Sequence, residues 1–205
     1  MSKFVRPLHY LIESNKKFRD MEKSIVMRNN KHSLAIWITG LSASGKTTLA
    51  TIISSRLREL GMPLIMLDGD DLRKILGETT HYNREDRKEL AFMYARMVQS
   101  LSRQNVVVVI ATVALFKEVH EWNRKNIKGY FEVFLDVSFE ELRRRDPKHI
   151  YQRYDEGKIN NVAGLDLDID IPIAPDLHLI FEKNTTPEMN ADVLLGRLPV
   201  FIDTK

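Results

Sequence analysis

The sequence predicts one doubly wound α/β domain built on a mostly parallel sheet of five strands. From residue 34 onward, short apolar runs alternate with segments that carry helix signals. This alternation is typical of helices packed on both faces of a parallel sheet. The apolar runs are nearly continuous, as expected for strands that are covered on both sides. The expected strands span residues 34–39, 63–68, 105–112, 131–136 and 177–182.

The composition suits a single soluble domain, with 205 residues of which 43% are hydrophobic and 29% charged. The absence of cysteine excludes disulfides and thiolate metal sites and fits a cytoplasmic location. The first residues lack the apolar core of a signal peptide, and no apolar run approaches a membrane span, so we expect no membrane association. The net charge of +3 is spread along the chain, so we expect no nucleic-acid partner.

The N-terminal part differs in character from the rest. Residues 1–33 are polar and basic, with scattered apolar positions. This pattern predicts an N-terminal extension with a weak helix over 7–23 and a turn at Asn29-Asn30. The folded domain is then expected to span residues 34–205.

The first expected strand runs directly into Gly40-Leu-Ser-Ala-Ser-Gly-Lys-Thr47, a complete G-x-x-x-x-G-K-[ST] phosphate-binding loop. A helix pattern follows and stops at Gly61. Because strand, glycine loop and helix form the context that the motif requires, a chance match is the weaker interpretation. The residues expected to bind ATP phosphates are Gly40, Leu41, Ser42, Ala43, Ser44, Gly45, Lys46, Thr47 and Thr48.

Each part of this loop has a chemical role. Gly40 and Gly45 allow the backbone to curl, so that its N–H groups point at phosphate oxygens. The helix that follows adds the positive end of its dipole. Lys46 is expected to meet the β- and γ-phosphates, and Thr47 to offer its hydroxyl to Mg²⁺. The loop therefore predicts ATP as phosphoryl donor and Mg²⁺ as cofactor.

Three later helices begin at capping signals. Asn83 is a helix cap, Ser138 and Glu141 form a capping box, and Thr186-Pro187 places proline at a first helical position. The expected helices span 84–103, 139–145 and 187–195.

Between the last two helices lies a long polar stretch, 146–176, which is broken by glycine and proline. A loop of this length inside a compact domain is more often functional than accidental. We therefore expect a lid over the substrate site.

Carboxylates and arginines follow the second expected strand, which ends in Leu67-Asp-Gly-Asp-Asp-Leu-Arg73 near the phosphate loop. Asp68 is placed to accept a proton from an acceptor hydroxyl or to hold Mg²⁺ through water, and the alternative is a turn with a helix cap. Asp70 either serves the metal or caps the next helix. Arg73 and Arg87 either form a fork for an anionic substrate or belong to surface charge pairs, and the residues alone leave both interpretations open.

Several blocks in this order resemble the adenylylsulfate kinase family, over roughly residues 30–196. That family transfers the γ-phosphoryl group of ATP to the 3′-hydroxyl of adenylyl sulfate. The resemblance implies a P-loop nucleotide kinase fold with a lid, and a homodimer. The blocks are Gly40–Thr48, Leu67–Arg73, Asp86-Arg87, Phe131–Asp136, Arg145–Lys148, Leu165-Asp166 and Pro172.

The resemblance also implies roles for individual residues. Lys46 and Asp68 would be catalytic, with Asp68 as base and, together with Thr47, on the metal side. Arg145 would belong to the lid, near the base of ATP. Tyr82 would stack on the acceptor base, and Arg73 and Arg87 would bind the phosphate–sulfate bridge of the acceptor. The residues implied in acceptor binding are Asp70, Arg73, Tyr82, Arg87, Lys148 and Val162.

The sequence departs from the family pattern on the acceptor side only. Val162 stands where the family has a second stacking phenylalanine, and Leu90 where it has an asparagine. Phe92 and Met93 replace paired arginines, and residues 112–115 read Thr-Val-Ala-Leu in place of Phe-Ile-Ser-Pro. Since stacking is worth about 1–3 kcal/mol per base, losing one aromatic face should weaken binding of an adenine acceptor.

These departures, with the stretch Phe116–Asn123, resemble a diverged branch of the family tied to bacterial capsule synthesis. Members of that branch resemble kinases of cytidine diphosphoramidate. Both adenylyl sulfate and such a cytidine nucleotide remain open as acceptors. Two further alternatives are a nucleotide-binding regulator that has lost transfer, and a kinase of a non-nucleotide alcohol in which Tyr82 belongs to the core.

Overall fold

The computed structural model describes residues 33–77 and 83–199. The helix expected over 7–23, the turn at Asn29-Asn30 and the predicted stacking residue Tyr82 lie outside the described residues. No helix within the described ranges is long and apolar enough to cross a membrane.

Five parallel strands form the sheet, in the order β2-β3-β1-β4-β5, which confirms the predicted fold class. The strands are β1 (Leu34–Gly40), β2 (Leu64–Asp68), β3 (Val107–Thr112), β4 (Tyr130–Asp136) and β5 (Leu177–Ile180). The helices are α2 (Lys46–Glu59), α3 (Gly69–Leu76), α4 (Arg84–Ser102), α5 (Lys117–Asn126), α6 (Phe139–Arg145), α7 (Ile150–Asp155) and α8 (Pro187–Arg197).

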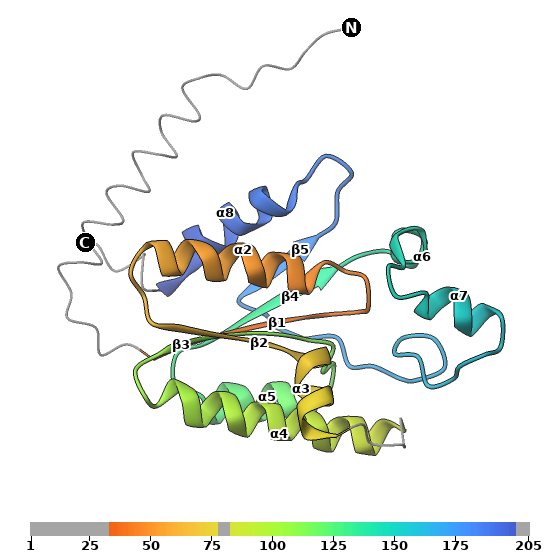
Figure 1. Cartoon of the computed structure of the whole chain (residues 1–205), viewed down its shortest axis with the longest axis horizontal. Helices are drawn as coiled ribbons and strands as arrows, with labels where there is room; N and C mark the ends of the chain where they lie inside the picture. Colours follow the sequence, from red (N-terminus) through yellow and green to blue (C-terminus); the bar gives the residue numbers. More distant parts are fainter. Residues whose placement is uncertain (1–32, 78–82, 200–205) are drawn as a thin grey trace, which may run out of the picture.

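Two helical layers cover the sheet. Helices α2 and α8 pack on one face, and α4 and α5 on the other, with α3 beside α4 (Figure 1). β1 lies in the middle, so its side chains are buried on both faces, and Trp37 is 0% exposed. This explains why the strands read as continuous apolar runs.

The strand register brings the carboxyl ends of the strands to one edge. Asp68 at the end of β2 aligns with Ala111 of β3, and Gly40 at the end of β1 aligns with Leu135 of β4. The chain leaves β1 toward β2 on one side and reaches β4 on the other, so this edge contains a topological switch point, where ligands of doubly wound sheets bind.

The structure differs from the expected elements inside the segment 146–176 and at several element ends; β3, for example, begins at Val107 rather than at residue 105. The segment 146–176, expected as a loop, contains the helix α7. The last strand ends at Ile180 rather than at residue 182, although the backbone N–H of Phe181 still donates to Asp136. The helix α7 has six residues, too few to show helical periodicity in the sequence. Phe181 follows the end of β5, and its ring lies under the guanidinium of Arg145, a contact between residues far apart in the chain.

Candidate active site

The phosphate loop has the backbone conformation that its glycines permit. Gly40 has φ of +150°, and a Cβ there would lie 2.6 Å from the carbonyl oxygen of Leu135. Gly45 has φ of +96° and is the N-cap of α2. Any other residue would be strained at both positions. The loop therefore ends at the N-terminus of a 14-residue helix, which attracts anions.

The Lys46 ammonium points into this loop. Its Nζ donates to the carbonyl oxygen of Leu41 at 2.6 Å and lies 3.4 Å from the Ser44 hydroxyl. Desolvation lowers the pKa of Lys46 to about 8; Asp68 opposes this shift and Arg73 adds to it. Burial disfavours the charged form of Lys46, and a phosphate bound in the loop would stabilise that charged form again.

Asp68 caps the next helix, as one of the two interpretations predicted, and it also contacts the phosphate loop. Its Oδ1 accepts from the backbone N–H of Asp70 and caps α3, while its Oδ2 accepts from the Thr47 hydroxyl at 2.7 Å. Thr47 and Asp68 thus present two hard oxygen donors side by side, a set that fits Mg²⁺. Within the described ranges, no group of three or more His, Cys, Asp or Glu side chains could hold a metal.

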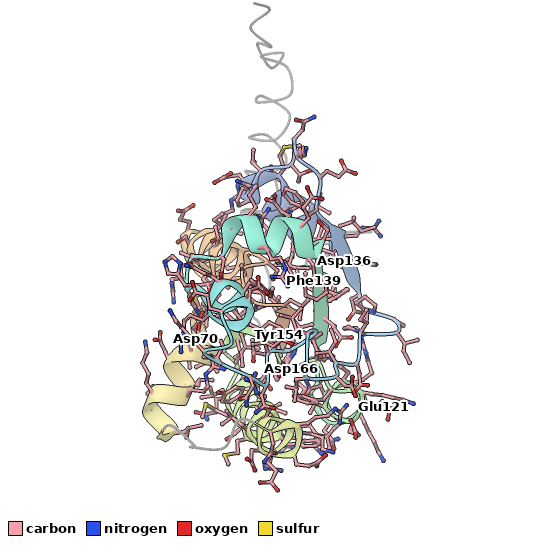
Figure 2. The ribbon with its side chains drawn as sticks, turned by 90° about the vertical axis from the view of Figure 1, so that its right-hand side faces the viewer. Asp70, Glu121, Asp136, Phe139, Tyr154 and Asp166 are labelled. Carbon is pink, nitrogen blue, oxygen red and sulfur yellow. The ribbon has the colours of Figure 1, made fainter. Side chains whose placement is uncertain are left out.

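The next carboxylate along the chain, Asp70, pairs with two cations, one on α3 and one on the lid. The carboxylate of Asp70 forms ion pairs with Arg73 from its own helix and with Lys148 from the lid. Figure 2 shows Asp70 on α3, at the edge of the molecule toward which the lid folds. Arg73 therefore has both the local charge pair and the cleft position that the sequence left as alternatives.

The lid is a small folded unit with its own core. Leu142, Tyr151 and Val162 are buried together, and Leu41 of the phosphate loop packs against them. The Tyr151 hydroxyl donates to the carbonyl oxygen of Ser42 at 3.0 Å, so the lid contacts the loop directly. Val162 also borders the cleft, but it is only 6% exposed. Its contact with a ligand would therefore be small.

Two arginines of α4 hold the returning arm of the lid. Arg87 donates to the carbonyl oxygen of Asn161 at 2.8 Å. Arg84 forms an ion pair with Asp170 at 2.7 Å. The arm that contains Asp166 accordingly lies in front of the sheet in Figure 2, and it forms one wall of the cleft.

Arg145 lies over the outer side of the phosphate loop. Its Nε donates to Glu141 at 2.7 Å, and its guanidinium stacks on the Phe181 ring at 4.3 Å from the centroid. Hydrogen bonds from Arg144 and Arg145 lower the pKa of Glu141 to about 2. The Ser138 hydroxyl accepts from the backbone N–H of Glu141, as the predicted capping box requires. The Glu141 carboxylate instead accepts from Arg144 and Arg145, so the reciprocal bond of the box does not form.

These groups line one open cleft of about 1430 Å³ along the carboxyl edge of the sheet. Single-ligand pockets usually hold about 300–1,000 Å³, so this cleft has room for two. All of the described site residues predicted from sequence border this cleft except Gly40 and Leu41. Gly40 packs against Leu135, and Leu41 packs in the core of the lid. The predicted lining residues are Ser42, Ala43, Ser44, Gly45, Lys46, Thr47, Thr48, Asp68, Asp70, Arg73, Arg87, Arg145, Lys148 and Val162.

Three aromatic residues of the site were not predicted to have a role there. Tyr94 lies on α4, where its hydroxyl donates to the carbonyl oxygen of Gly69 at 3.2 Å, and burial raises its pKa to about 12. Tyr151 and Phe181 contact the loop and Arg145 from far along the chain. The available signal was tyrosine at a buried position, where its hydroxyl needs a partner.

A phosphate loop, a Thr–Asp oxygen pair and a cationic cleft under a lid define the class of P-loop kinases. The family model described as Adenylylsulphate kinase matches residues 32–180. The chain belongs to this adenylylsulfate kinase family, and it is a phosphotransferase with a hydroxyl group as acceptor.

Relatives with both acceptors resemble the chain. A cytidine diphosphoramidate kinase of Campylobacter jejuni is 38% identical over 172 residues, which cover 84% of this chain and 99% of the relative. An adenylyl-sulfate kinase of Pseudomonas aeruginosa is 31% identical over 194 residues, covering 94% and 96%. The structure of the Mycobacterium tuberculosis APS kinase CysC in complex with AMPPNP and APS superimposes with a TM-score of 0.76 at 29% identity, covering 82% and 99%.

Proposed function

We propose that this enzyme transfers the γ-phosphoryl group of ATP to the ribose 3′-hydroxyl of cytidine diphosphoramidate or a closely related cytidine nucleotide. The observation that carries the proposal is the lining of the cleft, in which half-buried Leu90 and the largely buried Ala114 and Leu115, here called the aliphatic wall, occur together with the cations of Arg73 and Lys148. An aliphatic wall suits a small pyrimidine ring, and the cations suit a doubly charged phosphate linkage. The 38% identity to a cytidine diphosphoramidate kinase supports the same acceptor.

The donor side follows from the loop. Backbone N–H groups of residues 40–47 and the Lys46 ammonium would bind the β- and γ-phosphates, with Arg145 and Phe181 beside the base of ATP. Thr47 and Asp68 would hold Mg²⁺, which when bound neutralises charge on the phosphates. Both arrangements stabilise the charge of the transferred group rather than forming a bond to it.

On the acceptor side, Asp68 would accept the proton of the 3′-hydroxyl as that oxygen attacks the γ-phosphorus. The second oxygen of the carboxylate stays bound to the N–H of Asp70, which keeps its orientation. Arg73, Arg87 and Lys148 would bind the anionic linkage of the acceptor. The ion pairs of Asp70 with Arg73 and Lys148 would break as the acceptor enters. Catalysis would thus rest on positioning and charge neutralisation.

Adenylyl sulfate is the second candidate, favoured by the match of the family model over most of the chain. With that acceptor the enzyme would serve sulfate assimilation, and with the cytidine nucleotide capsule synthesis. A homodimer, implied by the family resemblance, stays a prediction.

Release of ADP in the presence of each nucleotide tests the transfer itself. We expect ADP release to depend on the acceptor, and to stop with a 3′-deoxycytidine acceptor or in the Lys46→Met variant. ADP release that continues unchanged without acceptor, or with the 3′-deoxy compound, would contradict transfer to the 3′-hydroxyl. A folded protein that binds ATP but releases no ADP with any nucleotide would indicate the regulator instead.

A further inference from the structure

Three aspartates alternate along the returning arm of the lid, at positions 166, 168 and 170. Asp166 accepts from the backbone N–H groups of Asn161 and Val162, at 2.8 and 2.7 Å. It therefore closes the turn at the start of the arm and is used by the fold.

Asp170 anchors the other end of the arm. Its carboxylate accepts from Arg84 at 2.7 Å and from the backbone N–H of Lys117 at 3.0 Å. Its own N–H donates to the carbonyl oxygen of Leu115 at 2.9 Å. These bonds attach the arm to the start of α4 and to the segment between β3 and α5, which contains Leu115 of the aliphatic wall.

Asp168 lies between these anchors and borders the cleft. It is exposed, and within the part of the chain that the structure describes its carboxylate has no hydrogen bond or ion pair. The buried Leu167 before it exchanges backbone hydrogen bonds with Val162 and Gly164. The backbone on both sides of Asp168 is thus held, and its carboxylate remains on the cleft wall.

An exposed carboxylate on this wall is free to accept a hydrogen bond from a ligand donor. The phosphate groups of the two substrates would repel it, and the cations that bind such groups lie elsewhere, at Arg73 and Lys148. An acceptor base that packs on the aliphatic wall, as proposed above, would offer an exocyclic amino group in the same cleft, which Ile169 also lines. Carboxylates accept hydrogen bonds from cytosine N4 in this way.

We infer that Asp168 determines the acceptor base by accepting a hydrogen bond from its exocyclic amino group, which for the proposed cytidine acceptor is N4. Uracil carries an oxygen at that position. Two hydrogen-bond acceptors would then face each other, so the carboxylate would disfavour binding of a uridine nucleotide. This inference rests on the proposed function. A hydrogen bond to a charged group is worth enough to give a preference for cytidine over uridine of at least about tenfold.

The test compares kcat/KM for cytidine diphosphoramidate and its uridine counterpart in the wild type, Asp168→Asn and Asp170→Asn. An asparagine can turn either its oxygen or its NH₂ toward the base, so in Asp168→Asn we expect the cytidine preference to fall at least about tenfold, toward equality. Asp170→Asn is the matched control on the same arm. It should lower kcat/KM for both acceptors together and leave their ratio unchanged.

The outcomes separate this inference from the proposed function. A wild type that uses cytidine and uridine acceptors equally, or an Asp168→Asn ratio equal to that of the wild type, overturns the role of Asp168 and leaves the proposed function standing. A wild type that uses neither pyrimidine overturns the proposed function, and the inference with it. Asp168→Ala serves as a second variant, with the same expected loss of preference and no new donor.

Discussion

At Lys46, burial favours the neutral form of the side chain, whereas phosphate binding favours the charged form. Burial lowers its pKa to about 8, while the phosphates it is expected to meet require the charged form. The unfolded chain keeps this lysine protonated up to its ordinary pKa of 10.5. The ligand-free fold therefore binds fewer protons between about pH 8 and pH 10.5, and the contribution of Lys46 to the free energy of unfolding rises over that range.

ATP binding should consequently take up a proton at high pH. Phosphates beside Lys46 raise its pKa again, so we expect uptake of up to one proton per ATP at pH 9 and little from this group at pH 7. Calorimetric titration in buffers with different ionisation enthalpies measures this number. The Lys46→Met variant is the control and should show no uptake from this position. Binding at pH 9 without proton uptake in the wild type would contradict the role of Lys46.

Asp68 combines a structural and a chemical role, which a conservative change can separate. Asp68→Asn keeps an oxygen for the N–H of Asp70 but removes the charge beside Thr47. We expect kcat to fall by about 100- to 10,000-fold while ATP affinity changes much less, because a base acts in the transition state. Steady-state kinetics with equilibrium ATP binding measures both. Lost ATP binding with normal turnover of the remaining complex would mark Asp68 as a turn residue only.

At the scale of elements, the lid is tied to the rest of the molecule at several points. Lys148 pairs with Asp70, Tyr151 bonds to Ser42, and Arg84 holds Asp170. The contact between Lys148 and Asp70 joins partly exposed groups, so its strength is modest and an incoming anion can replace it. The lid is therefore held in part by a contact, between Lys148 and Asp70, for which an anionic substrate would compete.

Hydrogen exchange over 146–176 tests this arrangement. ATP analogue and acceptor together should slow exchange in this segment, since they add ligand contacts to the lid. Lys148→Met should speed exchange in the ligand-free protein by about two- to fivefold. Lys158→Met is the matched control, because Lys158 pairs with Glu156 on the lid itself. Exchange that is equally slow with and without ligands would contradict a lid that closes on substrate.

Sequence reasoning reached the local features of this site and missed the long-range ones. The phosphate loop, its helix and Asp68 could be predicted because glycine conformation, caps and strand ends are encoded within a few residues. The stacking of Arg145 on Phe181 and the bond from Tyr151 to Ser42 join residues far apart in the chain. No short-range pattern encodes such pairs, so they required the structure.

For the whole molecule, the parallel sheet explains why the predicted site residues that the structure describes gather at one edge. The switch point at β1 opens a cleft between the strand ends, and the lid covers it. The cleft is lined by residues 42–48 of the phosphate loop and also by the cations and the aliphatic wall that we propose for the acceptor. We therefore expect the acceptor side to decide which nucleotide is phosphorylated.

Competition between the two acceptors tests that claim most directly. With cytidine diphosphoramidate and adenylyl sulfate at equal concentration in one reaction, the ratio of the 3′-phosphorylated products gives the ratio of the two kcat/KM values. We expect the cytidine product to exceed the adenylyl product by at least about tenfold, because the aliphatic wall cannot replace a second stacking ring for adenine. A product mixture dominated by phosphorylated adenylyl sulfate would contradict the account and make adenylyl sulfate the acceptor.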